Sequence, residues 1–214
     1  PPLLLSSAAS DVYKRQVHPM ANLFIFSNDL RLEDNAALYN ASLSKNGLEA
    51  LFLFNKDKWQ LHYESPLKIK FQLNNLEKIK EELNNLNINL RVLSPKLDDE
   101  NKLILEEALK INASKVFINS EYGFNEKQRD ENLRKLLADN RIDLIEFDSS
   151  IINPKKIVTG AGTYFKVFTP YSRSFREELN KEYLQCFPPP AKQQTKICLL
   201  YTSPSPLDVL RSRM

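Results

Sequence analysis

Short apolar segments alternate with helical patterns along this chain, and no other feature limits its fold as strongly. Strands are expected at residues 23–26, 48–54, 89–93, 115–119 and 143–147. The second segment is almost continuously apolar, as is typical of a strand covered on both faces in a parallel sheet. Strands that alternate with helices favour parallel pairing with right-handed crossovers. The sequence therefore predicts an α/β fold, a doubly wound, five-stranded parallel sheet with helices on both faces, Rossmann-like in type.

The segments between these strands carry helix signals. Asp34 or Asn35 is expected to cap a short helix over 36–38, and Pro66 opens the longest helix, in which apolar residues recur every three or four positions. Two more helices are expected at 103–109 and 126–139. The segment 55–66 is expected to form a loop. After the fifth strand we expect an irregular loop, a helix from about Ser172 and a polar, proline-rich linker.

The segment 116–130 turns from an apolar run through Gly123 into a charged helix start. Asn125 is expected to cap this helix, with Gln128 completing a capping box. In parallel α/β sheets, ligands bind beyond the carboxyl ends of the strands. The side chains expected at that edge follow strands one, two and four: Asn28, Asp29, Arg31 and Asp34; Trp59, His62 and Tyr63; Glu121, Tyr122, Asn125 and Glu126.

Each of these groups also has a purely structural interpretation. His62 has no partner in sequence for metal binding or acid–base chemistry and can be a solvated loop residue. Asn125 and Glu126 can serve the helix start alone. The remaining structural interpretations are an ion pair and a cap for Asp29, Arg31 and Asp34, and packing under its own loop for Trp59.

Charge and motifs exclude several function classes. The chain has a net charge of +3, but residues 20–195 are neutral overall, so the net charge gives no argument for a surface that binds nucleic acid. The patterns GxGxxG, GxxxxGK[ST] and GxSxG are absent, which argues against dinucleotide, P-loop and serine-hydrolase chemistry. Cys186 is the only cysteine of the expected domain, so neither a disulfide nor a cysteine metal site is predicted. No apolar run reaches membrane-spanning length, and a cytoplasmic location is expected.

The two ends of the chain differ in character from the rest. Residues 1–19 and 197–214 resemble translated sequencing-adapter sequence, and we exclude them from the fold prediction. The natural protein is then expected to begin at Met20 and to continue beyond residue 196. The segment 188–196 is interpreted as the start of an interdomain linker.

Four segments together resemble the N-terminal α/β domain of the DNA photolyase and cryptochrome family. They are FSNDLRLEDNAAL at 26–38, WQLHYESP at 59–66, NSEYGFNEKQRD at 119–130 and FTPYSRSF at 168–175. They follow one another in the family's order. The resemblance covers about residues 22–187, and the domain is expected to span residues 20–187. It is strongest to the folate-type microbial deoxyribodipyrimidine photolyases.

The resemblance implies a light-harvesting domain that binds an antenna chromophore. In the folate-type members this is methenyltetrahydrofolate, and the matching positions are His62, Asn125 and Glu126; a deazaflavin is the alternative. FAD and the site for damaged DNA belong to a C-terminal helical domain that is expected to be absent from this chain. Blue-light repair of pyrimidine dimers is thus expected of the full-length protein, a lyase, and not of this part alone.

Two other functions are compatible with the same residues. A signalling cryptochrome has the same domain, and an α/β domain that binds adenine nucleotides has a similar topology. One departure from the family pattern is Ser27, which stands where an arginine is usual, before Asn28. This replacement removes a polar anchor from the first loop without affecting the expected fold.

Overall fold

The computed structural model describes residues 21–96, 99–148, 156–179 and 186–194. The predicted flanks at 1–19 and 197–214 lie outside these ranges, as does the start of the loop after the fifth strand. None of the helices in these ranges is both long and apolar enough to cross a bilayer.

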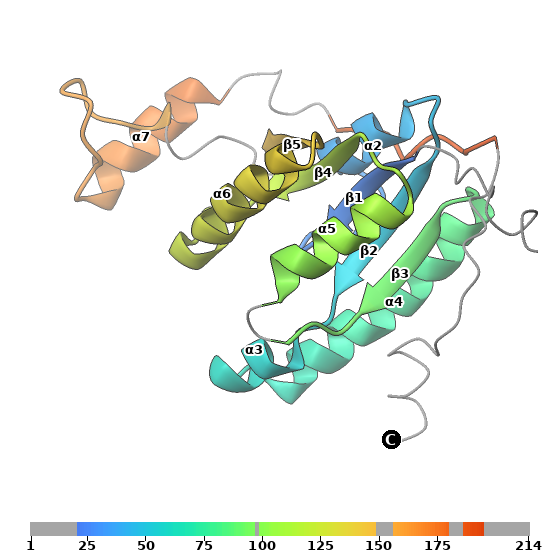
Figure 1. Ribbon diagram of the computed structural model, residues 1–214. Coiled ribbons are helices and arrows are strands. Elements are labelled where there is room, and N and C mark those ends of the chain that lie inside the picture. Colours follow the sequence, from blue (N-terminus) through green and yellow to red (C-terminus); the bar gives the residue numbers. More distant parts are fainter. Residues whose placement is uncertain (1–20, 97–98, 149–155, 180–185, 195–214) are drawn as a thin grey trace, which may run out of the picture.

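Five strands in the described ranges form one parallel sheet in the order β3-β2-β1-β4-β5, which confirms the predicted α/β fold. The chain runs outward from β1 to β3 and then crosses back to the other side of β1 (Figure 1). The strands are β1 (Asn22–Phe26), β2 (Leu48–Leu53), β3 (Asn89–Leu93), β4 (Lys115–Ser120) and β5 (Asp143–Asp148). The helices are α2 (Ala36–Ser42), α3 (Lys56–Leu61), α4 (Pro66–Asn85), α5 (Glu100–Lys110), α6 (Phe124–Asp139) and α7 (Phe168–Glu178).

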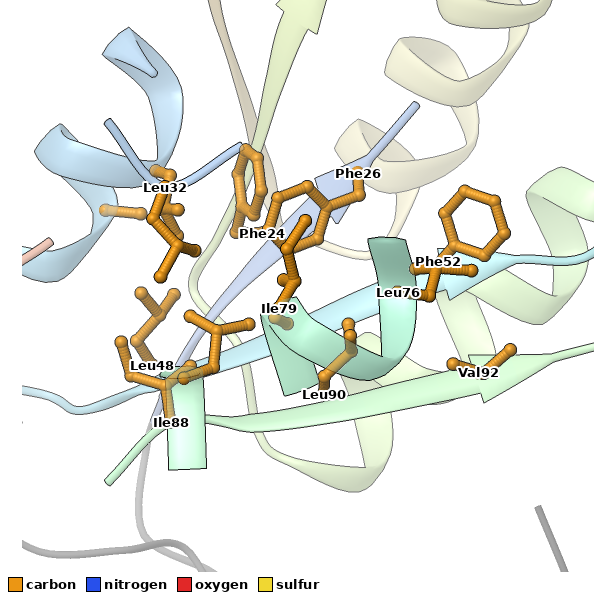
Figure 2. Close-up of a cluster of buried hydrophobic side chains, with 14 of the residues drawn as sticks. Phe24, Phe26, Leu32, Leu48, Phe52, Leu76, Ile79, Ile88, Leu90 and Val92 are labelled. Atoms are coloured by element: carbon orange, nitrogen blue, oxygen red, sulfur yellow. The ribbon is translucent and has the colours of Figure 1, made fainter. Parts of the chain in front are cut away.

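The two faces of the sheet carry separate hydrophobic cores. Because successive side chains of a strand point to opposite faces, Phe24 and Phe26 of β1 pack with α2 and α4, whereas Leu23 and Ile25 pack with α5 and α6. Figure 2 shows the first of these cores, in which Ile79 of α4 lies over the sheet. Burying each large apolar side chain contributes roughly 1.5–3 kcal/mol. The helices are therefore held on both faces, as predicted.

The prediction of a loop over 55–66 is wrong, because this segment contains the short helix α3. Asn55 caps it through a side-chain oxygen that accepts from the Lys58 backbone N–H at 2.9 Å. Trp59 packs edge-on against Phe54, with ring centroids 4.3 Å apart. The cap and the aromatic contact together stabilise a short helix, which could not be predicted from a pattern of apolar residues. As a result, His62 directly follows a helix.

The predicted capping box at Asn125 is also wrong, since α6 begins earlier, at Phe124, with Gly123 as its N-cap. The Gly123 carbonyl accepts from the Lys127 N–H at 3.0 Å, so Asn125 and Glu126 both lie in the first helical turn. By contrast, the predicted cap at Asn35 is confirmed, because its side chain accepts from the Leu38 N–H at 3.1 Å.

Helix α7 begins four residues before the predicted start at Ser172. Pro170 lies in its first turn, where a missing backbone N–H costs nothing because that donor has no partner within the helix. The proline therefore does not delay the helix, although the prediction from sequence placed it in the preceding loop.

Residues 186–194, in the region predicted as a linker, run across α2 to the end of α4. The Asp34 N–H donates to the Phe187 carbonyl at 2.8 Å, and the Ala191 N–H donates to Ser42 Oγ at 2.8 Å. At the far end, the Gln193 N–H donates to the Leu86 carbonyl at 2.9 Å. This segment thus ties the two helices of one face together. Whether a domain ends here stays a prediction.

Candidate functional site

The strand order places a crevice at the carboxyl ends of the strands. The chain leaves β1 toward β2, whereas β4 lies on the opposite side of β1, so the loops after β1 and β4 diverge at this point. Crevices of this kind are the usual ligand sites of open α/β sheets. In Figure 1 the strand arrows point toward the edge at which α3 lies.

A cavity of about 360 Å³ lies at this edge. Its floor is formed by the apolar ends of the strands, and helices α3, α4, α5 and α6 supply its polar walls. This volume falls within the range of small-molecule sites. The polar and charged side chains that line it are Ser27, Asn28, Asn55, Lys58, His62, Glu64, Lys68, Gln72, Glu100, Glu121, Asn125, Glu126, Arg129 and Asp130.

The cavity brings together all three residues that the family resemblance suggested. His62 is the C-cap of α3, while Asn125 and Glu126 come from the first turn of α6, more than sixty residues later. His62 and Asn125 are exposed and Glu126 is half-buried. Trp59 also lines the cavity. Tyr63 and Tyr122 do not line it, although they follow the same strands.

Glycine at position 123 leaves room for the Glu126 carboxylate over the start of α6. A Cβ atom on Gly123 would collide with the end of the Glu126 side chain in this position, so a larger residue would require that carboxylate to move. Because Gly123 has an ordinary φ of −64°, its role is to provide space and not to adopt an unusual backbone conformation. The carboxylate also lies next to unpaired backbone N–H groups of the first turn, which favour a negative charge there.

A buried polar network holds the loop after β1 in place. The Asn119 side chain accepts from the Ala37 N–H at 3.1 Å and donates to Asn35 Oδ1 at 2.8 Å and to the Asp29 carboxylate. Asp29 in turn accepts from the Ser27 N–H at 2.8 Å. The predicted ion pair is present only between Arg31 and Asp34, at 3.9 Å on the surface. Asp29 instead connects the cavity loop to β4.

Arg129 and Asp130 belong to the cavity wall, and neither was predicted from the sequence. The Arg129 Nε donates to Asp130 at 2.9 Å, and its Nη2 donates to Glu121 at 3.2 Å. Asn28 donates to the other oxygen of Glu121 at 2.7 Å. Helix periodicity could have identified Arg129 and Asp130, since they follow Glu126 by three and four positions and therefore lie on the same face of α6.

The buried pair Arg129 and Asp130 has shifted pKa values. Burial raises the pKa of Asp130 above the usual aspartate value, although the Arg129 guanidinium lowers it, and Glu146 and Glu121 add to the rise. Burial alone would lower the pKa of Arg129, but the attraction of Asp130, Glu121 and Glu100 outweighs this and raises it. The Asp130 side chain is 9% exposed, so the charge of its carboxyl group is only partly hydrated.

The Asp130→Asn substitution is expected to make stability less dependent on pH. Since the pKa of Asp130 is raised in the folded chain, its contribution is fully present below the unfolded value of 3.8 and is lost as pH rises through the folded pKa. The asparagine variant has no carboxyl group at this position and therefore does not lose stability in this way. The difference between the free energy of unfolding of the variant and that of the wild type should therefore shift in favour of the variant as pH rises from about 3.5 to 7.

Urea unfolding at several pH values measures this difference. Glu131→Gln, at the exposed next position of α6, controls for the removal of one negative charge. A difference between Asp130→Asn and wild type that stays constant across the pH range would contradict the expectation.

The described ranges contain no group of three or more His, Cys, Asp or Glu residues arranged to hold a metal ion. The cavity offers hydrogen-bond donors, acceptors and charges around an apolar floor. Such a lining suits a small organic ligand.

Comparisons with known proteins agree with the fold. A family model described as DNA photolyase matches residues 22–192. A deoxyribodipyrimidine photo-lyase from Vibrio cholerae is 29% identical over 184 residues, which are 85% of this chain and 38% of that protein. The chain thus spans less than two fifths of this relative.

Two solved structures share the fold at low sequence identity. A cryptochrome from Synechocystis superimposes with a TM-score of 0.72 at 23% identity, covering 88% of this chain and 40% of that one. An archaeal photolyase from Sulfolobus tokodaii, solved with two FAD molecules, has a TM-score of 0.65 at 21% identity, covering 90% and 41%.

Proposed function

Because this chain belongs to the DNA photolyase family, we propose that residues 20–187 form the light-harvesting domain of a deoxyribodipyrimidine photolyase, with methenyltetrahydrofolate as the antenna chromophore. The observation that carries the proposal is the shared cavity of His62, Asn125 and Glu126. Repair of pyrimidine dimers in DNA, with FAD in a C-terminal helical domain, is proposed for the whole protein. The antenna would absorb light and pass the excitation energy to that FAD.

The residues present fit a folate ring. The Glu126 carboxylate accepts hydrogen bonds, as the N–H groups of a pterin require, and the Asn125 amide can both donate and accept. His62 approaches the same space from α3. An apolar floor beneath these groups suits the flat face of the ring, so the cavity would bind such a chromophore in one orientation.

A flavin-type chromophore is the second candidate for the cavity. The Sulfolobus tokodaii photolyase was solved with two FAD molecules and is described as implying a novel light-harvesting cofactor. A deazaflavin has the same ring shape as the flavin of FAD and similar polar edges. A flavin and a deazaflavin would each place an extended ring over the strand ends.

Two other functions have less support. A signalling cryptochrome is consistent with the Synechocystis neighbour, but the Vibrio cholerae relative with higher identity is a photo-lyase. Binding of an adenine nucleotide would need a loop that cradles phosphates, and the residues after β1 are SNDLRL, without glycine.

The Glu126→Gln substitution is expected to weaken binding of methenyltetrahydrofolate to this chain by about 10- to 100-fold, because a hydrogen bond to a charged group contributes roughly 1.5–3 kcal/mol. His62→Ala should weaken binding by a smaller factor, since His62 is exposed and its removal costs the chromophore contact with only one wall of the cavity. The absorbance and fluorescence of the chromophore, titrated with protein, measure both affinities.

Glu131→Gln is the matched control on the same helix, because Glu131 is exposed and does not line this cavity. Equal affinities for wild type, Glu126→Gln and His62→Ala would refute the site. Tight binding of ATP by calorimetry, with no binding of folate or deazaflavin, would instead favour the adenine-nucleotide function.

A further inference from the structure

One lysine of the cavity has no partner. Lys58, in α3, is half-buried and lines the cavity, and within the described residues its ammonium group makes no hydrogen bond or ion pair. Lys68, the other lysine of the lining, is paired with Glu64 at 2.8 Å. An ammonium group partly removed from water and without a counter-charge favours an anionic partner.

An amide without a partner lines the same cavity. Gln72 of α4 lines the cavity, and its Oε1 atom is buried with no hydrogen-bond partner. Since no neighbour determines which end of the amide points inward, Gln72 can present either its oxygen or its NH₂ group to a ligand. It follows Lys68 by one helical turn, so both face the same space.

Apart from Glu126, the other charged groups of the cavity are already engaged. Arg129 is held by Asp130 and Glu121, at 2.8 and 3.2 Å, and therefore does not compete for an anion. On the α3 side, Glu64 is paired with Lys68, and Glu100 accepts from Asn55 at 2.8 Å. The α6 side keeps the Glu126 carboxylate. The unpaired positive charge of the cavity thus lies on α3, at Lys58, and the unpaired negative charge lies on α6, at Glu126.

We infer that Lys58 and Gln72 form an anion subsite that binds the negatively charged end of the antenna chromophore, while its ring lies toward Glu126. This inference rests on the proposed function and adds the orientation and chemical class of the ligand. Two sources supply such an anion, namely the glutamate carboxylates of a folate and the phosphate of a flavin nucleotide. Lys58 would then select chromophores that carry an acidic tail.

The test compares ligand pairs in which only one member carries an acidic group. The probes are methenyltetrahydrofolate and the matching methenylpterin without its benzoylglutamate tail, and FMN and riboflavin, each titrated by fluorescence against the whole chain. Lys58→Gln is expected to weaken binding of the anionic member of a pair by about tenfold and to reduce its salt dependence. The member without the acidic group should bind wild type and variant alike.

Lys56→Gln is the matched control, because Lys56 is an exposed lysine of the same helix and does not line the cavity. Gln72→Leu should also selectively weaken the anionic member, and circular dichroism confirms that each variant is folded. If the variants lose affinity for the anionic member of the folate pair alone, the subsite binds a carboxylate tail. If they lose affinity for FMN alone, it binds a phosphate.

Two results would overturn the inference. Equal effects of Lys58→Gln on both members of each pair, or no effect on either, would refute the anion subsite while the antenna function stands. If the wild-type chain binds none of the four probes, the proposed function fails and the subsite fails with it.

Discussion

Replacing Leu76 by alanine is expected to lower the free energy of unfolding by about 3 kcal/mol, the largest effect of a single substitution that we anticipate. Leu76 is completely buried in the core between α4 and the sheet, where Figure 2 shows it near Phe52. The substitution removes apolar burial and leaves a cavity that rigid neighbours on the sheet cannot fill. Urea or thermal unfolding followed by circular dichroism measures the loss.

Leu67→Ala provides the matched control on the same helix. Leu67 is 78% exposed, so its truncation should change stability by no more than about 0.5 kcal/mol. If both variants lost the same stability, α4 would not be packed through the face that contains Leu76, and the arrangement of this core would be wrong.

Asn119→Ala is expected to destabilise the chain by about 2–3 kcal/mol, which is large for an amide. The Asn119 side chain is 5% exposed and connects the end of β4 to α2 and to Asp29. Its loss leaves the Ala37 N–H, at the start of α2, buried and unpaired. An unsatisfied buried donor costs roughly 1–3 kcal/mol, and the lost bonds to Asn35 and Asp29 add to this.

The same substitution should also loosen the loop that carries Ser27 and Asn28 into the cavity, since Asp29 holds this loop. Faster amide hydrogen exchange at 27–29, measured alongside unfolding, distinguishes this local effect from global destabilisation. Asn74→Ala, at an exposed position of α4, is the control and should be neutral. An Asn119 variant as stable as wild type would show that the network does not hold these elements together.

Much of the fold could be predicted because its signals are local. The alternation of side chains in β1 requires two covered faces, and the spacing of Leu73, Leu76, Ile79 and Leu83 defines one buried side of α4. The errors are local too. Helix α3 depends on one cap and one aromatic contact, and α6 begins at Phe124 because the carbonyl of Gly123, and not that of Asn125, accepts the first helical hydrogen bond.

The site could be predicted only in part. His62, Asn125 and Glu126 came from resemblance to a family, because no spacing in the sequence relates α3 to α6. Lys58 and Gln72 carry no signal at all in the sequence, where a lysine and a glutamine on amphipathic helices are indistinguishable from solvated residues. What distinguishes them is the cavity that they face and the absence of partners there.

The sequence by itself determined the five strands, the helices other than α3 and which of their faces are apolar, since these depend on residue type and short-range spacing. Only the tertiary structure decided that β4 pairs with β1 and not with β3. This pairing brings Asn119 to Asp29, ninety residues away, and α6 to the same edge as α3. Such contacts depend on the order of the strands, which the packing of the whole sheet selects and no single segment encodes.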